Sequence, residues 1–223
     1  MDNGDRVILQ EIFNNSAQMY AFIARLYRVE VDEQLWEQLK KSDFAAVPDI
    51  PKLTEGYLMM DTYLKNHGDD PITDLAVDYA RTFLGFGPTA GQGAFPYESV
   101  YTSHDGVIMQ EARDEVVELY RKENMVKDAS FREPEDHIAF ELVYLEHLCY
   151  KLEEALQNDD DAMLSLYLSK KIDFLQNHIM NWVPRFCIDI DKVAGTLFYK
   201  ALAKITLGYL QMGLELAEEL HMN

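Results

Sequence analysis

Two short segments of the chain hold side chains suited to binding a partner, and the first is Glu133-Pro134-Glu135-Asp136-His137. It places three carboxylates and one imidazole within five residues. Carboxylates form strong, charge-assisted hydrogen bonds with the planar guanidinium group of arginine. The carboxylate of Asp136 would equally accept hydrogen bonds from the free amides of a first helical turn. The sequence leaves both roles open.

The second segment is Phe95-Pro96-Tyr97-Glu98-Ser99-Val100-Tyr101, which gathers aromatic rings in a stretch without helical spacing. Such rings either fix a loop onto the protein core or line a groove that receives an extended peptide. The candidate contact residues in this segment are Pro96, Tyr97, Ser99 and Tyr101.

Other patterns argue against catalysis and against a resident metal. The glycine-rich stretch from Gly85 to Gly106 lacks the Gly-Lys-Ser/Thr of a P-loop, and Ala90 stands where a dinucleotide fingerprint needs glycine. Only His221 follows a glutamate by three residues, whereas a carboxylate-bridged metal site in a helical bundle needs that spacing twice. With neither HExxH nor GxSxG present, we expect no catalytic residues, no metal ligands and no cofactor.

The charge of the chain limits its partners. Its 223 residues include 20 Lys and Arg against 39 Asp and Glu, a formal net charge of −19. A nucleic-acid binder needs clustered cations to neutralise phosphates, so that class is excluded and a cationic partner is favoured.

Cys149 and Cys187 lie in apolar stretches, which predicts that both are buried thiols. No run of about 18 apolar residues and no basic leader occurs, so we expect a cytoplasmic protein without a membrane span.

The elements that must position these segments are helices. Apolar residues recur every three or four positions over 7–26, 35–39, 53–64 and 73–84, and again over 107–121, 138–156 and 162–180. The glycine and proline content of residues 85–106 predicts a long loop, and the polar residues 123–132 indicate a connector. Trp182-Val183-Pro184 predicts a helix end, since proline disfavours helical geometry in the residue before it, and a last helix begins near Asp191.

These patterns predict an all-α protein. We expect residues 1–223 to form a single helical domain of two halves, about 1–122 and 133–223, joined by the connector.

Taken together, these residues resemble the TorD/DmsD/NarJ family of redox-enzyme maturation chaperones over nearly the whole chain. Tyr97 replaces the tryptophan often found after the loop proline of that family. The matching elements, in order, are Phe83-Leu84 with Gly87-Pro88, then 96–101, Glu133 to Ile138 continuing as AFELVYLEHL, His178 with 182–186, and 198–203.

The resemblance implies a cytoplasmic helical-bundle chaperone of the TorD type. Such a protein binds the twin-arginine signal peptide, and sometimes the apo form, of a molybdoenzyme catalytic subunit and delays export until the cofactor is inserted. Asp136 and His137 fall on the family's peptide-binding motif, and Pro96, Tyr97 and Ser99 fall on its loop motif. Guanine nucleotide binding and domain-swapped dimers are also associated with the family, so a monomer and a swapped dimer both stay open.

We interpret the site as a carboxylate beside an aromatic wall. Asp136 or Glu133 would pair with a peptide arginine, and His137 would either orient that arginine or bond the peptide backbone. Pro96, Tyr97 and Tyr101 would form the apolar side. Two alternatives stay open: a helical adaptor that binds a folded redox-enzyme subunit without recognising its signal peptide, and a helical hydrolase acting on nucleotide. The sequence does not identify the client enzyme.

Overall fold

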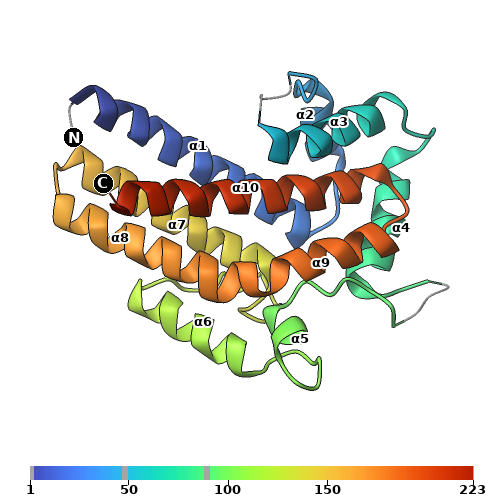
Figure 1. Ribbon diagram of the computed structural model, residues 1–223. Coiled ribbons are helices and arrows are strands. Elements are labelled where there is room, and N and C mark those ends of the chain that lie inside the picture. The colour runs from blue at the N-terminus through green and yellow to red at the C-terminus, as the bar shows by residue number, and fades with distance from the viewer. Residues whose placement is uncertain (1–2, 47–49, 88–90, 223) are drawn as a thin grey trace. The chain divides into compact units, whose positions relative to one another are not determined.

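The computed structural model describes residues 3–46, 50–87 and 91–222 and confirms the all-α prediction (Figure 1). Within these residues the chain forms no named strand, and one isolated antiparallel bridge joins Tyr97 to His137. The helices are α1 (Asn3–Arg28), α2 (Glu33–Lys41), α3 (Pro51–Lys65), α4 (Pro71–Leu84), α5 (Glu98–Thr102), α6 (Glu111–Lys122), α7 (Ile138–Gln157), α8 (Asp161–Phe174), the π-helix η1 (Leu175–Ile179), α9 (Met180–Val193) and α10 (Leu197–Met222).

The chain folds into two compact units, each assembled from separate stretches of sequence. The first unit comprises Met1–Tyr27, Tyr97–Asn181 and Leu210–Asn223, and the second comprises Arg28–Pro96 and Trp182–Tyr209. The connector over residues 123–132 lies wholly inside the first unit. The division into halves at that connector, and the single-domain organisation, stay predictions.

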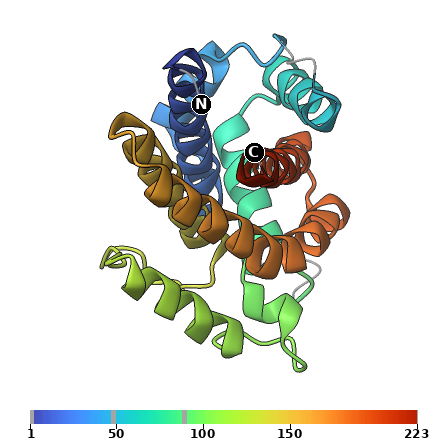
Figure 2. The same cartoon turned by 60° about the vertical axis from the view of Figure 1, so that its left-hand side comes forward.

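Helix α7 forms the core of the first unit. Its apolar stripe includes Leu142, Leu145 and Leu152, each 0% exposed, and a fully buried leucine contributes about 1.5–3 kcal/mol. Helix α8 packs along α7, and α6 lies against the same helix (Figure 2). The ring of Tyr120 on α6 contacts Phe140 of α7, with 4.9 Å between the ring centroids.

One residue of α8, Lys171, buries its charged side chain in this core. Lys171 is 0% exposed, and its Nζ donates to Cys149 Sγ across 3.4 Å. The same Nζ lies 5.5 Å from the ring centroid of Phe13 and 5.7 Å from that of Tyr20, which gives the ammonium two cation–π contacts. Both cysteines are free and buried, as the sequence predicted.

The second unit is built around a buried carboxylate. Asp78 on α4 is 0% exposed and accepts from Arg81 Nη2 at 2.7 Å. It also accepts from the backbone N–H groups of Gly195 and Thr196, at 2.8 and 2.7 Å, just before α10 begins. The side chain therefore fixes the turn between α9 and α10, because free amides at a helix start need an acceptor.

Four predicted element boundaries differ from the structure. The last helix, expected to begin near Asp191, begins at Leu197, because α9 continues to Val193. The loop expected over 85–106 contains α5, and α6 starts at Glu111 and not at Val107; Pro88 and Ala90 lie outside the described residues. Pro184 does not end a helix but lies inside α9. The π-helix η1 immediately precedes α9, and buried Trp182 and Phe186 flank the proline, so packing offsets the hydrogen bond that proline cannot donate.

Candidate functional site

Helix α5 depends on Asp136 for its start. A helix of five residues closes few internal hydrogen bonds, so its first amides need acceptors from elsewhere. The backbone carbonyl of Asp136 accepts from Glu98 N at 3.0 Å, and Asp136 Oδ2 accepts from Ser99 N at 2.9 Å. Asp136 is 0% exposed. Its carboxylate thus satisfies free helical amides, but those of α5 and not those of α7.

His137 caps α7 as a neutral imidazole. Its Nδ1 accepts from the backbone N–H of Ala139 at 3.1 Å, and the side chain is 3% exposed. Burial lowers the pKa of His137 to about 3. The ring also makes edge contacts with Tyr97 and Phe131, at centroid distances of 5.1 and 5.3 Å. His137 therefore joins the start of α7 to the segment that leads into α5.

A second buried contact ties α5 to the π-helix. Glu98 is 2% exposed and His178 is 8% exposed, and His178 Nδ1 lies 3.0 Å from Glu98 Oε2. Burial lowers the pKa of His178, but the hydrogen bond and charge of Glu98 outweigh it, so the pKa is raised above its ordinary value. Neither residue is among the site residues predicted from the sequence. The signal that could have found them was the presence of both in the segments that carry the family resemblance.

The two glutamates of the first segment have different surroundings. Glu135 is paired with Arg113 Nε at 2.7 Å and Lys127 Nζ at 2.9 Å. Burial raises the pKa of Glu135, but these hydrogen bonds outweigh it and lower the pKa to about 2. Glu133 is half-buried, and its Oε2 accepts from the hydroxyl of Tyr97 at 2.6 Å. The carboxylate of Glu133 accepts from a neutral phenol, whereas that of Glu135 is paired with two cations, so Glu133 is the better acceptor for an incoming cation.

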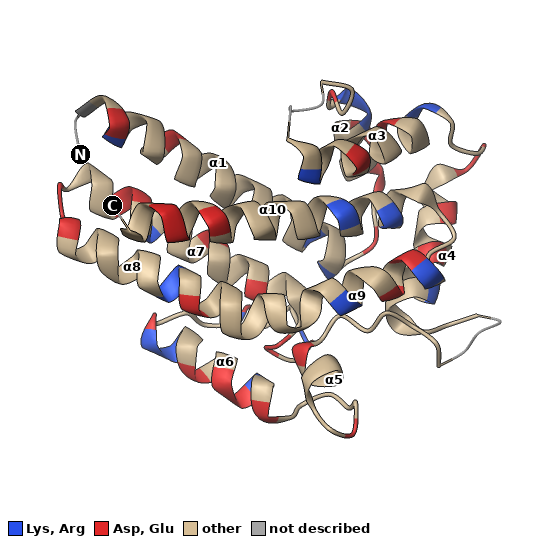
Figure 3. Cartoon of the chain, viewed as in Figure 1, with Lys and Arg blue, Asp and Glu red and all other residues tan. Residues whose placement is uncertain are grey.

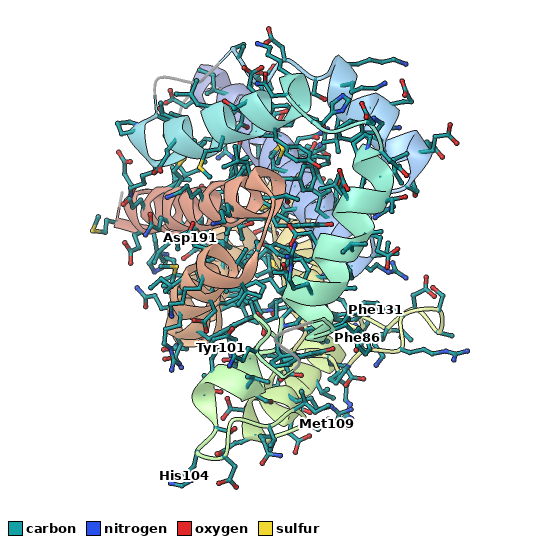
Figure 4. All side chains as sticks on the ribbon, turned by 90° about the vertical axis from the view of Figure 1, so that its right-hand side faces the viewer. Phe86, Tyr101, His104, Met109, Phe131 and Asp191 are labelled. Carbon is teal, nitrogen blue, oxygen red and sulfur yellow. The ribbon has the colours of Figure 1, made fainter. Side chains whose placement is uncertain are left out.

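An apolar turn follows α5 on the surface. Val107, Ile108 and Met109 are 47%, 46% and 58% exposed. The backbone N–H of Gln110 donates to Ser99 Oγ at 3.1 Å, which anchors the turn to α5. Tyr101 is half-buried on α5 itself, and Figure 4 shows Tyr101, His104 and Met109 on α5 and the loop after it. The apolar spacing of the sequence predicts a helix from Val107, so the exposed apolar surface of this turn is not expected from the sequence.

The structure brings six of the seven predicted site residues together in the first unit. Glu133, Tyr97 and Tyr101 lie partly at the surface, whereas Ser99, Asp136 and His137 are buried beneath them. Pro96 is buried and belongs to the second unit. We name the partly exposed set Tyr97, Tyr101, Val107 to Met109 and Glu133 the α5 surface.

The α5 surface has acidic and apolar character. Helix α6, which follows the apolar turn directly, exposes Glu111, Asp114, Glu115 and Glu118, drawn red in Figure 3. Carboxylates beside exposed aliphatic and aromatic groups suit a ligand that carries both cations and apolar side chains. Among the described residues, no group of three or more histidine, cysteine or acidic side chains is arranged to hold a metal ion.

A cavity of about 510 Å³ lies between α6 and the connector. Its apolar lining includes Val117, Tyr120 and Phe140, and its cations are Arg121 and Lys127. The one carboxylate in the lining, Glu135, is already paired with Lys127. This cavity therefore suits an apolar side chain better than an arginine.

Comparisons with known proteins give a consistent result. The family model described as nitrate reductase delta subunit matches residues 50–188. Chaperone protein TorD from Aliivibrio fischeri is 25% identical over 88% of this chain and 91% of its own length. Chaperone protein TorD from Vibrio cholerae serotype O1 (strain ATCC 39315) is 30% identical over 70% of this chain and 68% of its own length. Chaperone protein TorD from Shewanella pealeana is 23% identical over 97% of this chain and 96% of its own length.

Proposed function

Because this chain belongs to the nitrate reductase delta subunit family, together with the TorD chaperones, we propose that it is the dedicated chaperone of one molybdenum-dependent redox enzyme. The members it resembles are named chaperones, which are not enzymes, and the same holds for this chain. We propose that it binds the twin-arginine signal peptide of the catalytic subunit, and also its apo form, in the cytoplasm. Occupation of the signal peptide delays export until the cofactor is inserted.

The observation that carries this proposal is the α5 surface. A twin-arginine peptide has two fixed positive charges next to an apolar stretch, so its receptor needs a carboxylate beside apolar side chains. Glu133 supplies the carboxylate, and Tyr97, Tyr101 and the turn at Val107 to Met109 supply the apolar part. The net charge of −19 adds attraction at longer range.

The buried members of the motif take a different role in this proposal. Asp136 and His137 are 0% and 3% exposed, so they act as positioning residues that hold α5 and the start of α7. Ser99 links Asp136 to the apolar turn through its N–H and its Oγ. The contribution of Pro96 stays a prediction from the family's loop motif.

Three properties implied by the resemblance stay predictions. They are the binding of guanine nucleotide that is associated with the family, the choice between monomer and domain-swapped dimer, and the cytoplasmic location. Within the described residues, no helix is both long enough and apolar enough to cross a bilayer.

The test is calorimetric titration of the purified protein with signal peptides from molybdoenzymes encoded near its gene. Each peptide is paired with a twin-lysine variant, and each titration is run at two salt concentrations. We expect micromolar or tighter binding that needs the arginines, because lysine cannot make the bidentate contact, and that weakens with salt. Binding to the leaderless apo enzyme with no binding to any signal peptide would favour the adaptor alternative instead.

A further inference from the structure

A second surface of the first unit is concave and lies at the ends of three helices. Residues of the first turns of α1, the start of α8 and the last turns of α10 line a groove of about 840 Å³. These three helix ends lie on the same side of the view in Figure 1. Leu9, Leu164 and Leu168 line it, and Ile8 on its rim is 58% exposed. None of its lining residues belongs to the α5 surface.

Carboxylates surround this apolar lining. Asp5, Asp161 and Glu219 border the groove, and no lysine or arginine is among the residues that line it. The nearest arginine in sequence, Arg6, is paired with Asp159 at 3.3 Å and Asp161 at 2.8 Å, and its side chain is 14% exposed. Figure 3 shows red segments at both the start of α8 and the end of α10.

The groove combines an apolar interior with an anionic rim, which is the complement of one helical face. An amphipathic helix places apolar side chains at positions i, i+3, i+4 and i+7, and lysines or arginines beside that stripe would reach the rim. A volume of about 840 Å³ falls in the range that encloses ligands of several side chains' size. We propose that this groove docks a basic amphipathic helix of a partner protein.

Charge decides between this occupant and a second copy of the chain. Two copies would each bring a net charge of −19, and a self-contact at this acidic rim would add repulsion. A basic helix, in contrast, is attracted to the acidic rim of the groove. The proposal goes beyond the proposed function, because it needs no signal peptide and uses none of the residues of the α5 surface.

The probe is a fluorescently labelled Leu/Lys amphipathic helical peptide, titrated with the full chain and followed by anisotropy. Ile8→Asp puts a charge on the apolar rim at an exposed position, and Asp5→Lys with Glu219→Lys reverses the rim charge. The controls are Ile188→Asp, at a position 56% exposed in the second unit, and Glu33→Lys with Glu55→Lys, two exposed positions of the same unit that change the net charge by the same amount. Circular dichroism checks that every variant is folded.

We expect both groove variants to weaken the peptide by about tenfold or more and both controls to stay within about twofold of the unaltered chain. Equal losses in groove and control variants would overturn the proposal, because they would show general attraction to an acidic protein. Absence of peptide binding would overturn it too, as would a dimer that Ile8→Asp disrupts. Signal-peptide affinity should stay unchanged in the groove variants, so failure of signal-peptide binding and failure of the groove are separate results.

Discussion

The carboxylate of Asp136 accepts a hydrogen bond from the backbone N–H of Ser99 at 2.9 Å, although 37 positions separate the two residues in the chain. A side chain for which the sequence leaves open both a ligand contact and a helix cap therefore holds another segment of the same protein. The contact makes α5 part of the first unit and sets the position of Tyr101 and of the turn after it.

Replacing Asp136 by alanine should loosen α5. The variant leaves the amide of Ser99 buried without its acceptor, which costs about 1–3 kcal/mol in the free energy of unfolding. Hydrogen exchange should show faster exchange for the amides of residues 98–102. Asp136→Asn keeps an oxygen acceptor of the same shape, so its exchange rates should lie between those of the unaltered chain and those of Asp136→Ala. Unchanged protection of α5 in Asp136→Ala would contradict the positioning role.

Replacing Glu133 by glutamine should weaken binding of a twin-arginine peptide by about three- to tenfold, because a half-buried ion pair is lost. The measurement is calorimetry at low salt. Glu37→Gln on α2 removes one negative charge from a side chain that is 51% exposed and lies outside the α5 surface, and it serves as the control. If both variants lose affinity equally, the effect comes from net charge and Glu133 is not a contact residue.

The contact between Glu98 and His178 should make stability depend on pH. Burial lowers the pKa of His178, but Glu98 raises it by more, so the folded protein favours the protonated ring. The contact with Glu98 therefore stabilises the folded state fully at a pH below the pKa of unfolded histidine, about 6.5. This stabilisation is lost as the pH rises through the raised pKa of His178 in the folded protein. Urea unfolding from pH 6 to 8.5 should show this fall in the unaltered chain and a smaller fall in Glu98→Gln. Equal slopes would show that the pair contributes nothing.

Lys171 should tolerate methionine better than alanine. Methionine fills the same space without a buried charge, so Lys171→Met should lie within about 1 kcal/mol of the unaltered chain or be more stable. Lys171→Ala leaves a cavity beside Phe13, Tyr20 and Cys149 and should cost about 2–4 kcal/mol. Denaturant unfolding gives both values. Equal losses in the two variants would mean that the ammonium itself stabilises the core.

Helices with regular apolar spacing could be predicted from the sequence, whereas elements stabilised from a distance could not. The apolar spacing of Leu142, Leu145 and Leu152 is visible in the sequence of that segment alone, and the structure forms α7 there. Helix α5 has too few residues to show a period and depends on Asp136 for its start. The predicted helix end at Pro184 rests on the local backbone preference of proline alone, whereas the packing of its neighbours allows α9 to continue through it.

The candidate site divides in the same way. The two segments singled out in the sequence are in contact in the structure, since Glu133 accepts from Tyr97 and Asp136 accepts from Ser99. Residue types alone carry no information about burial, so the sequence left open whether Asp136 contacts a ligand or caps a helix. The apolar turn at Val107 to Met109 was missed because its exposed side chains continue the spacing of the helix that follows.

The interleaving of the two units affects how the protein folds during synthesis. The first unit needs residues from 3–27, 97–181 and 210–222, so it remains incomplete until the ribosome has made residue 222. The second unit closes only when 182–209 has emerged. Such non-local assembly slows folding and leaves early helices such as α1 without their partners, exposing apolar faces on the nascent chain. A protein of this topology is itself expected to depend on protection from aggregation while it is being made.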